Sequence, residues 1–293
     1  MYSRKEGPMD VKDVMHTAVT TVTPETRAST AHQVMTRRAA RMRHLPVVTD
    51  EGILVGILTD RDLRRAAASD APPMAEHELL YLLDKLYVRD IMTPEVMTVH
   101  GTTPVAEAGQ IFLQKKFGCL PVVRDNHTLE GILTVTDLLW AYTAQSEAER
   151  WVSVGSMMQT QVITATPTML LAEVQRLMRD NNIRHVPVVS GKRLAGMITD
   201  RDLREVSPSP ATTLTRGEIA YQMATTPIKT CMTTDVVWIS PDITMVDAAH
   251  VLVQRKIGCL PVVDNGTLVG IVTAIDCLRA FLHPVRVAER GET

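Results

Sequence analysis

One short phrase occurs four times in this chain, and it constrains the fold more than any other feature of the sequence. Each copy consists of a glycine, two apolar residues, a threonine, two variable residues and an aspartate. The four copies begin at Gly56, Gly131, Gly196 and Gly270. A second phrase, Leu-Pro-Val-Val or Val-Pro-Val-Val, precedes them at 45–48, 120–123, 186–189 and 260–263. Because self-similarity at a regular period defines a structural unit, the chain is predicted to contain four copies of one unit.

The predicted unit has the order strand, helix, strand, strand, helix, which places the chain in the α/β (α+β) class. Short apolar runs predict the opening strands at 19–22, 96–99, 162–165 and 236–239. The helical pattern is clearest in 241–255, where Met245, Ala248, Ala249 and Leu252 follow the spacing of an amphipathic helix. Turn residues such as 264–266 then separate two further strands.

A unit of this size cannot bury both its helices and its sheet alone, so the copies are expected to pair. Repeats one and three share Thr-Asp-Arg-Asp-Leu-Arg and are followed by similar inserts, with helices predicted at 76–86 and 215–224. Repeats two and four share Gly-Cys-Leu-Pro-Val-Val. The chain is therefore predicted to be a duplicated pair. The first module is placed at 1–145, with repeats at about 9–67 and 86–145, and the second at 146–293, with repeats at about 152–206 and 226–285.

Composition limits the partners of the chain. A net charge of −2 argues against bulk electrostatic attraction to nucleic acid or to an anionic membrane. No stretch stays apolar for the roughly 18 residues that span a bilayer, and the N-terminus lacks the apolar segment of a signal peptide. No aromatic residue recurs in the four copies as a platform for stacked bases. We therefore expect a cytoplasmic protein without membrane or nucleic-acid partners.

The sequence offers no metal site and no catalytic residues. The cysteines at 119, 231, 259 and 277 lack metal-binding spacing and are expected to be small core residues. Phosphate-loop, His-Glu-x-x-His and Gly-x-Ser-x-Gly motifs are absent, and the histidines do not recur together. The roughly 20 residues at each end outside the repeats are too few for a further catalytic domain. We expect a protein that is not an enzyme and requires no cofactor.

The four-fold pattern resembles the CBS domain, named after cystathionine β-synthase, over nearly the whole chain. This resemblance implies that consecutive repeats pack sheet to sheet as one module and that two modules form a flat disc. The disc would be closed within one chain or by a homodimer. The resemblance further implies that clefts between paired repeats bind adenosine-containing ligands. It also implies that the module regulates another protein. We expect an energy sensor for AMP, ADP or ATP that transmits occupancy to an unidentified partner by reorienting paired repeats.

The Thr and Asp of the repeated phrase have two readings. A threonine followed three residues later by an acid fits an N-terminal helix cap. A carboxylate at a helix start can also accept hydrogen bonds from a ribose diol. The resemblance assigns the aspartate to the ribose and the threonine to the sugar or phosphate, and both readings can hold together. These candidates are Thr59, Asp62, Thr134, Asp137, Thr199, Asp202, Thr273 and Asp276.

Basic residues near the repeated phrase are candidates for phosphate binding, because guanidinium groups match phosphate geometry. They concentrate in repeats one and three, whereas repeats two and four carry Gly-Cys at the corresponding place. The candidates are Arg43, His44, Arg61, Arg184, His185, Arg201, Lys116 and Lys256. A plain solvated face is the alternative. The sequence leaves open which aspartate faces which arginine.

By resemblance, the opening strands and the Pro-Val-Val strands line the pocket for the base. The candidates are Thr20, Val47, Met97, Val122, Ile163, Val188, Val237 and Val262. Aliphatic residues at these positions also fit an ordinary core. Two other functions remain open: a structural or interaction scaffold with empty sites, and binding of S-adenosylmethionine, a dinucleotide or single-stranded nucleic acid.

Overall fold

A computed structural model describes residues 9–36, 42–67, 76–115, 117–145, 152–206 and 216–283. The described residues divide into two compact units. Of the described residues, one unit contains those from 9 to 137 together with the first residues of α10 (Arg216–Thr225), and the other contains 138–206 and 221–283. The hairpins of repeats one and two therefore lie in one unit and those of repeats three and four in the other, and the boundary falls within α6 (Val135–Gln145), the closing helix of repeat two. The predicted join at 145/146 adjoins residues 146–151, which lie outside the described residues.

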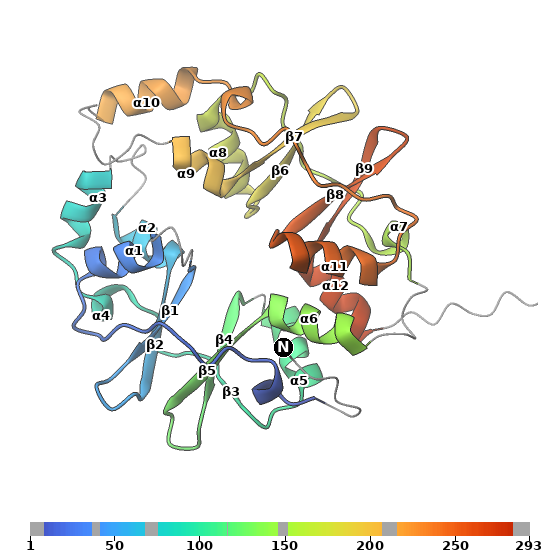
Figure 1. Cartoon of the computed structure of the whole chain (residues 1–293). Coiled ribbons are helices and arrows are strands. Elements are labelled where there is room, and N and C mark those ends of the chain that lie inside the picture. The colour runs from blue at the N-terminus through green and yellow to red at the C-terminus, as the bar shows by residue number, and fades with distance from the viewer. Residues whose placement is uncertain are drawn as a thin grey trace, which may run out of the picture. The chain divides into compact units, whose positions relative to one another are not determined.

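The unit that holds repeats one and two contains two antiparallel hairpins flanked by helices (Figure 1). Hairpin β1–β2 has His44 opposite Thr59, and hairpin β4–β5 has Cys119 opposite Thr134. A bridge between Ile53 and Thr128 joins the two hairpins. The elements of repeats one and two are η1 (Val11–Asp13), α1 (Ala28–Thr36), β1 (His44–Val48), β2 (Leu54–Thr59), α2 (Asp60–Ala67), α3 (Glu76–Leu83), α4 (Val88–Ile91), β3 (Val99–His100), α5 (Val105–Lys115), β4 (Cys119–Val123), β5 (Leu129–Thr134) and α6 (Val135–Gln145).

The unit that holds repeats three and four repeats this plan. Its hairpins β6–β7 and β8–β9 join through a pair between Arg193 and Thr267, which gives the strand order β6-β7-β9-β8. The mixed α/β class predicted from the sequence is confirmed. The elements other than α10 are α7 (Val154–Met157), α8 (Leu171–Asp180), β6 (His185–Ser190), β7 (Arg193–Thr199), α9 (Asp200–Val206), η2 (Ile228–Thr230), α11 (Met245–Arg255), β8 (Cys259–Asp264), β9 (Thr267–Thr273) and α12 (Ala274–Leu282).

The hairpins and the clearest helix follow local sequence signals. The turn between β8 and β9 has Asn265 and Gly266 at φ values of 46° and 79°, a backbone conformation that these residue types tolerate. The apolar stripe of α11 is buried along its whole length, as its spacing predicts. The insert helices are confirmed as α3 and α10, although α3 ends at Leu83 rather than Leu86.

The predicted opening strands are mostly absent as strands. Only Val99–His100 forms one (β3), and in the other repeats a single residue makes a parallel bridge to the first hairpin strand. The bridged residues are Val22, Ala165 and Ile239. The physical reason is that the preceding backbone pairs with the other repeat of the unit. Each stretch therefore crosses between two sheets instead of extending one of them.

Paired repeats exchange the segments that precede their opening stretches. In repeat one, the amide of Val11 donates to the carbonyl of Thr103 at 2.8 Å, and in repeat two the amide of Val88 donates to Thr26 at 2.8 Å. The second unit makes the same exchange through Val154 and Ile228. Because each repeat completes its partner in this way, the pair is the smallest unit that satisfies these backbone groups.

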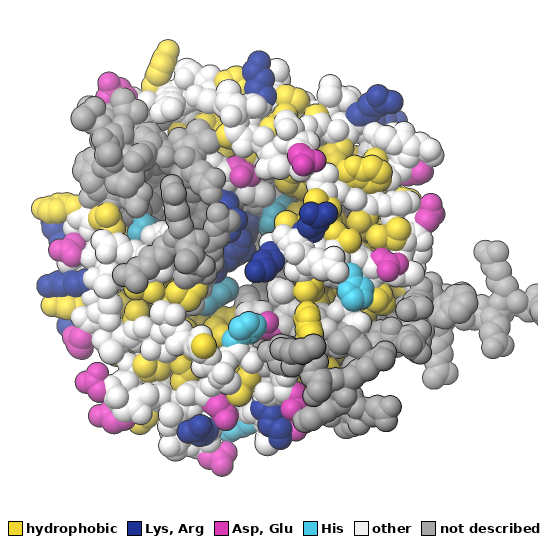
Figure 2. Space-filling view, in the orientation of Figure 1, with side chains coloured by type: hydrophobic (Ala, Val, Ile, Leu, Met, Phe, Trp, Pro, Cys, Tyr) yellow, Lys and Arg dark blue, Asp and Glu magenta, His cyan; other side chains and the backbone are white. Residues whose placement is uncertain are grey.

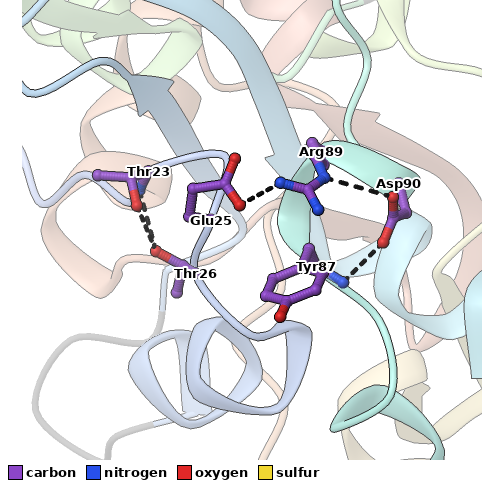
Figure 3. Close-up of polar contacts among 6 residues, drawn as sticks. All are labelled: Thr23, Glu25, Thr26, Tyr87, Arg89 and Asp90. Atoms are coloured by element: carbon purple, nitrogen blue, oxygen red, sulfur yellow. Dashed lines mark hydrogen bonds and ion pairs between the residues drawn. The ribbon is translucent and has the colours of Figure 1, made fainter.

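Side chains reinforce one of these exchanges (Figure 3). Arg89 lies between Glu25, with which it forms an ion pair, and Asp90, whose Oδ1 is 3.8 Å from the guanidinium Nε. The guanidinium groups of Arg27 and Arg89 also lie over the ring of Tyr87, at 4.1 and 4.6 Å from its centroid. These contacts fix the start of α4 against the turn before α1, so repeat two is held to repeat one at the surface.

The core is aliphatic, with one compact cluster at the hairpin of repeat one and another at the hairpin of repeat three. In repeat one, Leu45, Leu58 and Leu63 are almost fully buried together with Leu83 of the insert helix. Repeat three has the equivalent cluster, which includes Met223 of α10. A smaller cluster of Met197, Cys259 and Ile271 packs between the hairpins of repeats three and four. The insert helices therefore belong to the odd-numbered repeats, where they complete the core.

Candidate functional site

All four Thr-Asp pairs form the same helix cap. In each repeat, Oδ2 of the aspartate accepts hydrogen bonds from the backbone amide and the hydroxyl of the threonine three residues earlier. For Asp62 the two distances are 2.8 and 2.6 Å, and for Asp202 they are 2.7 and 2.8 Å. The capping reading is confirmed. Since the cap uses only Oδ2, the other oxygen, Oδ1, decides what each aspartate can still bind.

The surroundings of Oδ1 divide the four aspartates into two kinds. Oδ1 of Asp137 lies 3.2 Å from Nδ1 of His16, and Oδ1 of Asp276 accepts a hydrogen bond from Nη1 of Arg279 at 3.0 Å. Within the described part of the chain, Oδ1 of Asp62 and Asp202 has no hydrogen-bond or ion-pair partner. The odd-numbered repeats therefore present an uncommitted carboxylate oxygen at the start of a helix.

Each aspartate lies beside a stretch of chain from the other repeat of its unit. Four crossing stretches, defined as 16–22, 93–99, 159–165 and 233–239, begin at a bridge to the other repeat and end at a bridge to their own. The bridges pair Thr93 with Ile57, His16 with Ile132, Thr233 with Met197, and Gln159 with Ile271. Asp62 therefore faces the stretch 93–99, Asp137 faces 16–22, Asp202 faces 233–239, and Asp276 faces 159–165.

The candidates for the base pocket separate into two groups. Thr20, Met97, Ile163 and Val237 lie on the crossing stretches, where Met97 is 40% exposed and the others are exposed or half-buried. The four valines of the Pro-Val-Val strands have an exposed fraction of 0%. They are Val47, Val122, Val188 and Val262. These valine side chains belong to the core in this structure. Among the eight base-pocket candidates, the side chains accessible to a ligand are therefore those on the crossing stretches.

A methionine from the partner repeat explains the glycine of the repeated phrase. A Cβ on Gly131 would lie 2.7 Å from Sδ of Met15 and 2.9 Å from the carbonyl oxygen of His16. Gly56, Gly196 and Gly270 meet Met92, Met232 and Met158 in the same way. Sequence reasoning missed this contact, although the methionine that precedes every opening stretch was the available signal. The glycine thus allows the crossing stretch to approach the hairpin closely.

Histidines of the odd-numbered repeats pack on glycines of the even-numbered repeats. A Cβ on Gly118 would lie 2.5 Å from the ring of His44, and one on Gly258 would lie 3.1 Å from the ring of His185. Packing between paired repeats therefore accounts for the alternation of His and Gly at this position. The same histidines stand opposite Thr59 and Thr199 in the hairpin register, next to the uncommitted aspartates.

The other phosphate candidates differ in position. The carbonyls of Arg43 and Arg184 accept hydrogen bonds from the amides of Asp60 and Asp200, which places both arginines at the starts of α2 and α9. Arg43, Arg61 and Arg184 are exposed, and Arg201 is half-buried. Lys256 is exposed in a left-handed conformation at the end of α11. Lys116 lies outside the described residues. The helix starts that carry Asp62 and Asp202 therefore each have two arginines: Arg43 and Arg61 at α2, and Arg184 and Arg201 at α9.

The predicted core role of the cysteines is confirmed for three of them. Burial raises the pKa of Cys119, Cys259 and Cys277 to about 12, so these thiols stay protonated. Cys231 is half-buried, and its pKa is raised by burial and then by the charge of Asp202. This electrostatic contact agrees with the position of Asp202 beside the segment that leads into 233–239.

Three further observations concern surface charge, hydropathy and metal-binding side chains. Figure 2 shows Lys and Arg side chains interspersed with Asp and Glu over the face that it draws. Among the described helices, none combines the length and the apolar character that crossing a membrane requires. The same part of the chain contains no cluster of three or more His, Cys, Asp or Glu side chains arranged to hold a metal ion.

The contact between His16 and Asp137 leads to a titration experiment. Burial raises the pKa of Asp137 above its usual value, while Thr134 and His16 oppose this shift. His16→Thr should therefore raise the pKa of Asp137 further, as measured by ¹³C NMR of the carboxyl group. Because the folded state then binds the proton more tightly than the unfolded state, stability falls as the pH rises from the usual aspartate value through the raised one. An unchanged pKa in the variant would show that the imidazole does not act on this carboxylate.

The fold and these sites define a protein built from paired α/β repeats, with a capped carboxylate where each repeat meets its partner's crossing stretch. The chain belongs to the CBS domain family, whose model matches residues 11–69, 88–144, 154–209 and 228–283. This finding confirms the resemblance noted in the sequence.

Two archaeal proteins match most of the chain. Uncharacterized protein MJ1225 of Methanocaldococcus jannaschii is 29% identical over 279 residues, which cover 92% of this chain and 98% of that protein. Its crystal structure has a TM-score of 0.75 at 27% identity and covers 93% of this chain and 100% of the other. Uncharacterized protein MJ1404 of the same organism is 29% identical over 278 residues, but this chain spans only 61% of its length.

A crystal structure of an uncharacterized conserved protein from Pyrococcus horikoshii has a TM-score of 0.65 at 23% identity. It covers 93% of this chain and 100% of the other. At this identity the likeness concerns the fold alone. Both matches therefore extend over the full length of the solved chains.

Proposed function

We propose that this chain is a regulatory protein that binds AMP, ADP or ATP between paired repeats and transmits occupancy to a protein partner. The observation that carries the proposal is the uncommitted Oδ1 of Asp62 and Asp202 at a capped helix start, to whose first residue the backbone of Arg43 or Arg184 is hydrogen-bonded. A carboxylate in this position can accept hydrogen bonds from a ribose diol. Arg43 and Arg184 are suited to the phosphates, because guanidinium groups bind phosphate oxygens in pairs.

The adenine nucleotide is favoured by the family and by one relative. CBS domains cover the four repeats, and the crystal structure of MJ1225 is described as that of a candidate archaeal homolog of g-AMPK. We therefore test AMP first. The groups assembled at Asp62 are hydrogen-bond acceptors and cations suited to binding, so the proposed role is regulatory rather than catalytic.

The proposed mechanism follows from the crossing stretches. A ligand held by Asp62 of repeat one would also contact 93–99, which belongs to repeat two, so its occupancy favours one arrangement of the pair. Ligand at tenfold above its dissociation constant contributes about 1.4 kcal/mol. This energy is enough to bias the orientation of paired repeats, and it is too small to rebuild a core.

The direct test is calorimetric titration of nucleotide-free protein with AMP, ADP, ATP and S-adenosylmethionine. The matched variants are Asp62→Asn and Asp202→Asn, in which the amide oxygen keeps the cap while the NH₂ group cannot accept from a diol. Each variant should bind its ligand about 10–100-fold more weakly and melt close to the wild type. If S-adenosylmethionine binds more tightly than AMP, ADP and ATP, then S-adenosylmethionine is the ligand and the proposed adenine nucleotide is wrong.

The scaffold function is the second candidate, and the caps themselves favour it. Hydrogen bonds from Thr59 and its three equivalents satisfy Oδ2 without any ligand. If the protein melts cooperatively and none of these ligands produces heat, the Thr-Asp pairs act as caps alone. The search would then turn to protein partners.

A further inference from the structure

We infer that the chain itself closes two of its four aspartate sites, with His16 at Asp137 and Arg279 at Asp276, so that each unit takes one nucleotide. This inference rests on the proposed function and sets its stoichiometry. It follows from the difference in the surroundings of Oδ1, because Oδ2 accepts the same two hydrogen bonds from threonine in all four caps.

His16 closes the second repeat by direct contact. Its amide and carbonyl both bond to Ile132 at 2.9 Å, which fixes the backbone of His16 two residues from Thr134. The imidazole Nδ1 then lies 3.2 Å from Oδ1 of Asp137, a side chain that is only 9% exposed. The ring itself is 62% exposed. A ribose hydroxyl that needs Oδ1 would have to displace this ring.

The open repeats carry a shorter side chain at the same place. Thr93 pairs with Ile57 and Thr233 pairs with Met197 in the register that His16 has with Ile132. In the described structure, neither threonine forms a hydrogen bond with Asp62 or Asp202. Repeats one and two therefore differ at this position of the crossing stretch: Thr93 leaves Oδ1 of Asp62 open, whereas His16 closes Oδ1 of Asp137.

Arg279 closes the fourth repeat in a different way. It lies on α12 three residues after Asp276, and its Nη1 donates to Oδ1 at 3.0 Å. The aspartate is 1% exposed, so both of its oxygens are satisfied out of contact with water. Gln159 occupies the place of His16 in this repeat, opposite Ile271. The fourth site is thus closed from its own helix.

The chain offers a reciprocal pair of substitutions as the test. His16→Thr gives repeat two the residue found at the open sites, and Thr93→His gives repeat one the residue found at the closed site. Titration of the full chain with AMP and with ATP should give about two ligands for the wild type, three for His16→Thr and one for Thr93→His. His100→Ala is the control, because this exposed histidine faces Asp125 at 3.7 Å and no capped aspartate. It should leave the stoichiometry at two.

The site of any gained ligand is assigned by a second substitution. Adding Asp137→Asn to His16→Thr should return the stoichiometry from three to two. Four ligands on the wild type, or two on His16→Thr with wild-type stability, would overturn the closure and leave the proposed function intact. Absence of binding by every protein would overturn both.

Discussion

Replacing Gly196 with alanine is expected to lower the free energy of unfolding by about 1–3 kcal/mol, because an added methyl group has no room there. Its Cβ would lie 2.8 Å from the carbonyl oxygen of Thr233 and 3.0 Å from Sδ of Met232. A methionine side chain can rotate away, but the carbonyl belongs to the bridge that holds the crossing stretch. Relief of the clash must therefore displace 233–239 from Met197, with which Thr233 exchanges hydrogen bonds of 2.8 and 2.9 Å.

Chemical denaturation would measure this loss, and Gly155→Ala is the control in the same unit. A Cβ on Gly155 would have its nearest neighbours at 3.2 and 3.3 Å on Pro241, and the helical position favours alanine. The control should therefore change stability much less. The same displacement should also weaken nucleotide binding at Asp202. Wild-type stability in Gly196→Ala would mean that the crossing stretch moves freely, against the packing described above.

Replacing Asp276 with alanine is expected to cost about 2–4 kcal/mol, more than the same change at any other capped aspartate. The carboxylate of Asp276 is buried and accepts hydrogen bonds from the Thr273 amide, the Thr273 hydroxyl and Arg279. Its removal leaves the two donors of Thr273 without their acceptor in a partly buried place. Asp62→Ala should cost only about 1 kcal/mol, the usual value of a helix cap.

Thermal and chemical unfolding of both variants would test this order. Arg279→Ala is the control, since it removes the partner of Oδ1 while the cap on Oδ2 remains. Because Arg279 is 48% exposed, its loss should cost less than the loss of the aspartate. Equal costs for Asp62→Ala and Asp276→Ala would show that burial does not distinguish the two carboxylates.

Much of the fold was predictable because its signals are local. The turn at Asn265 and Gly266 and the buried stripe of α11 each depend on residues close together in sequence. The caps could be predicted for the same reason, since Thr59 and Asp62 are three residues apart. The resemblance to the CBS domain family rests on the repetition of these patterns four times.

The opening strands show where local reasoning fails. Apolar runs such as 236–239 predict strands, but a strand requires a neighbouring backbone along its length. The crossing stretches leave one repeat and join another, so most of their backbone has no such neighbour. The pairing of His44 with Gly118 was likewise beyond the sequence, which offered a phosphate contact for the histidine and no reason for the glycine.

The sequence by itself determined the number of repeats, their internal order and the capped aspartates. The tertiary structure decided which crossing stretch faces which aspartate, and hence that Oδ1 of Asp137 meets His16 in repeat two. The physical reason is that His16 and Asp137 are far apart along the chain. Their contact arises only when two repeats exchange segments, and no local pattern records that exchange.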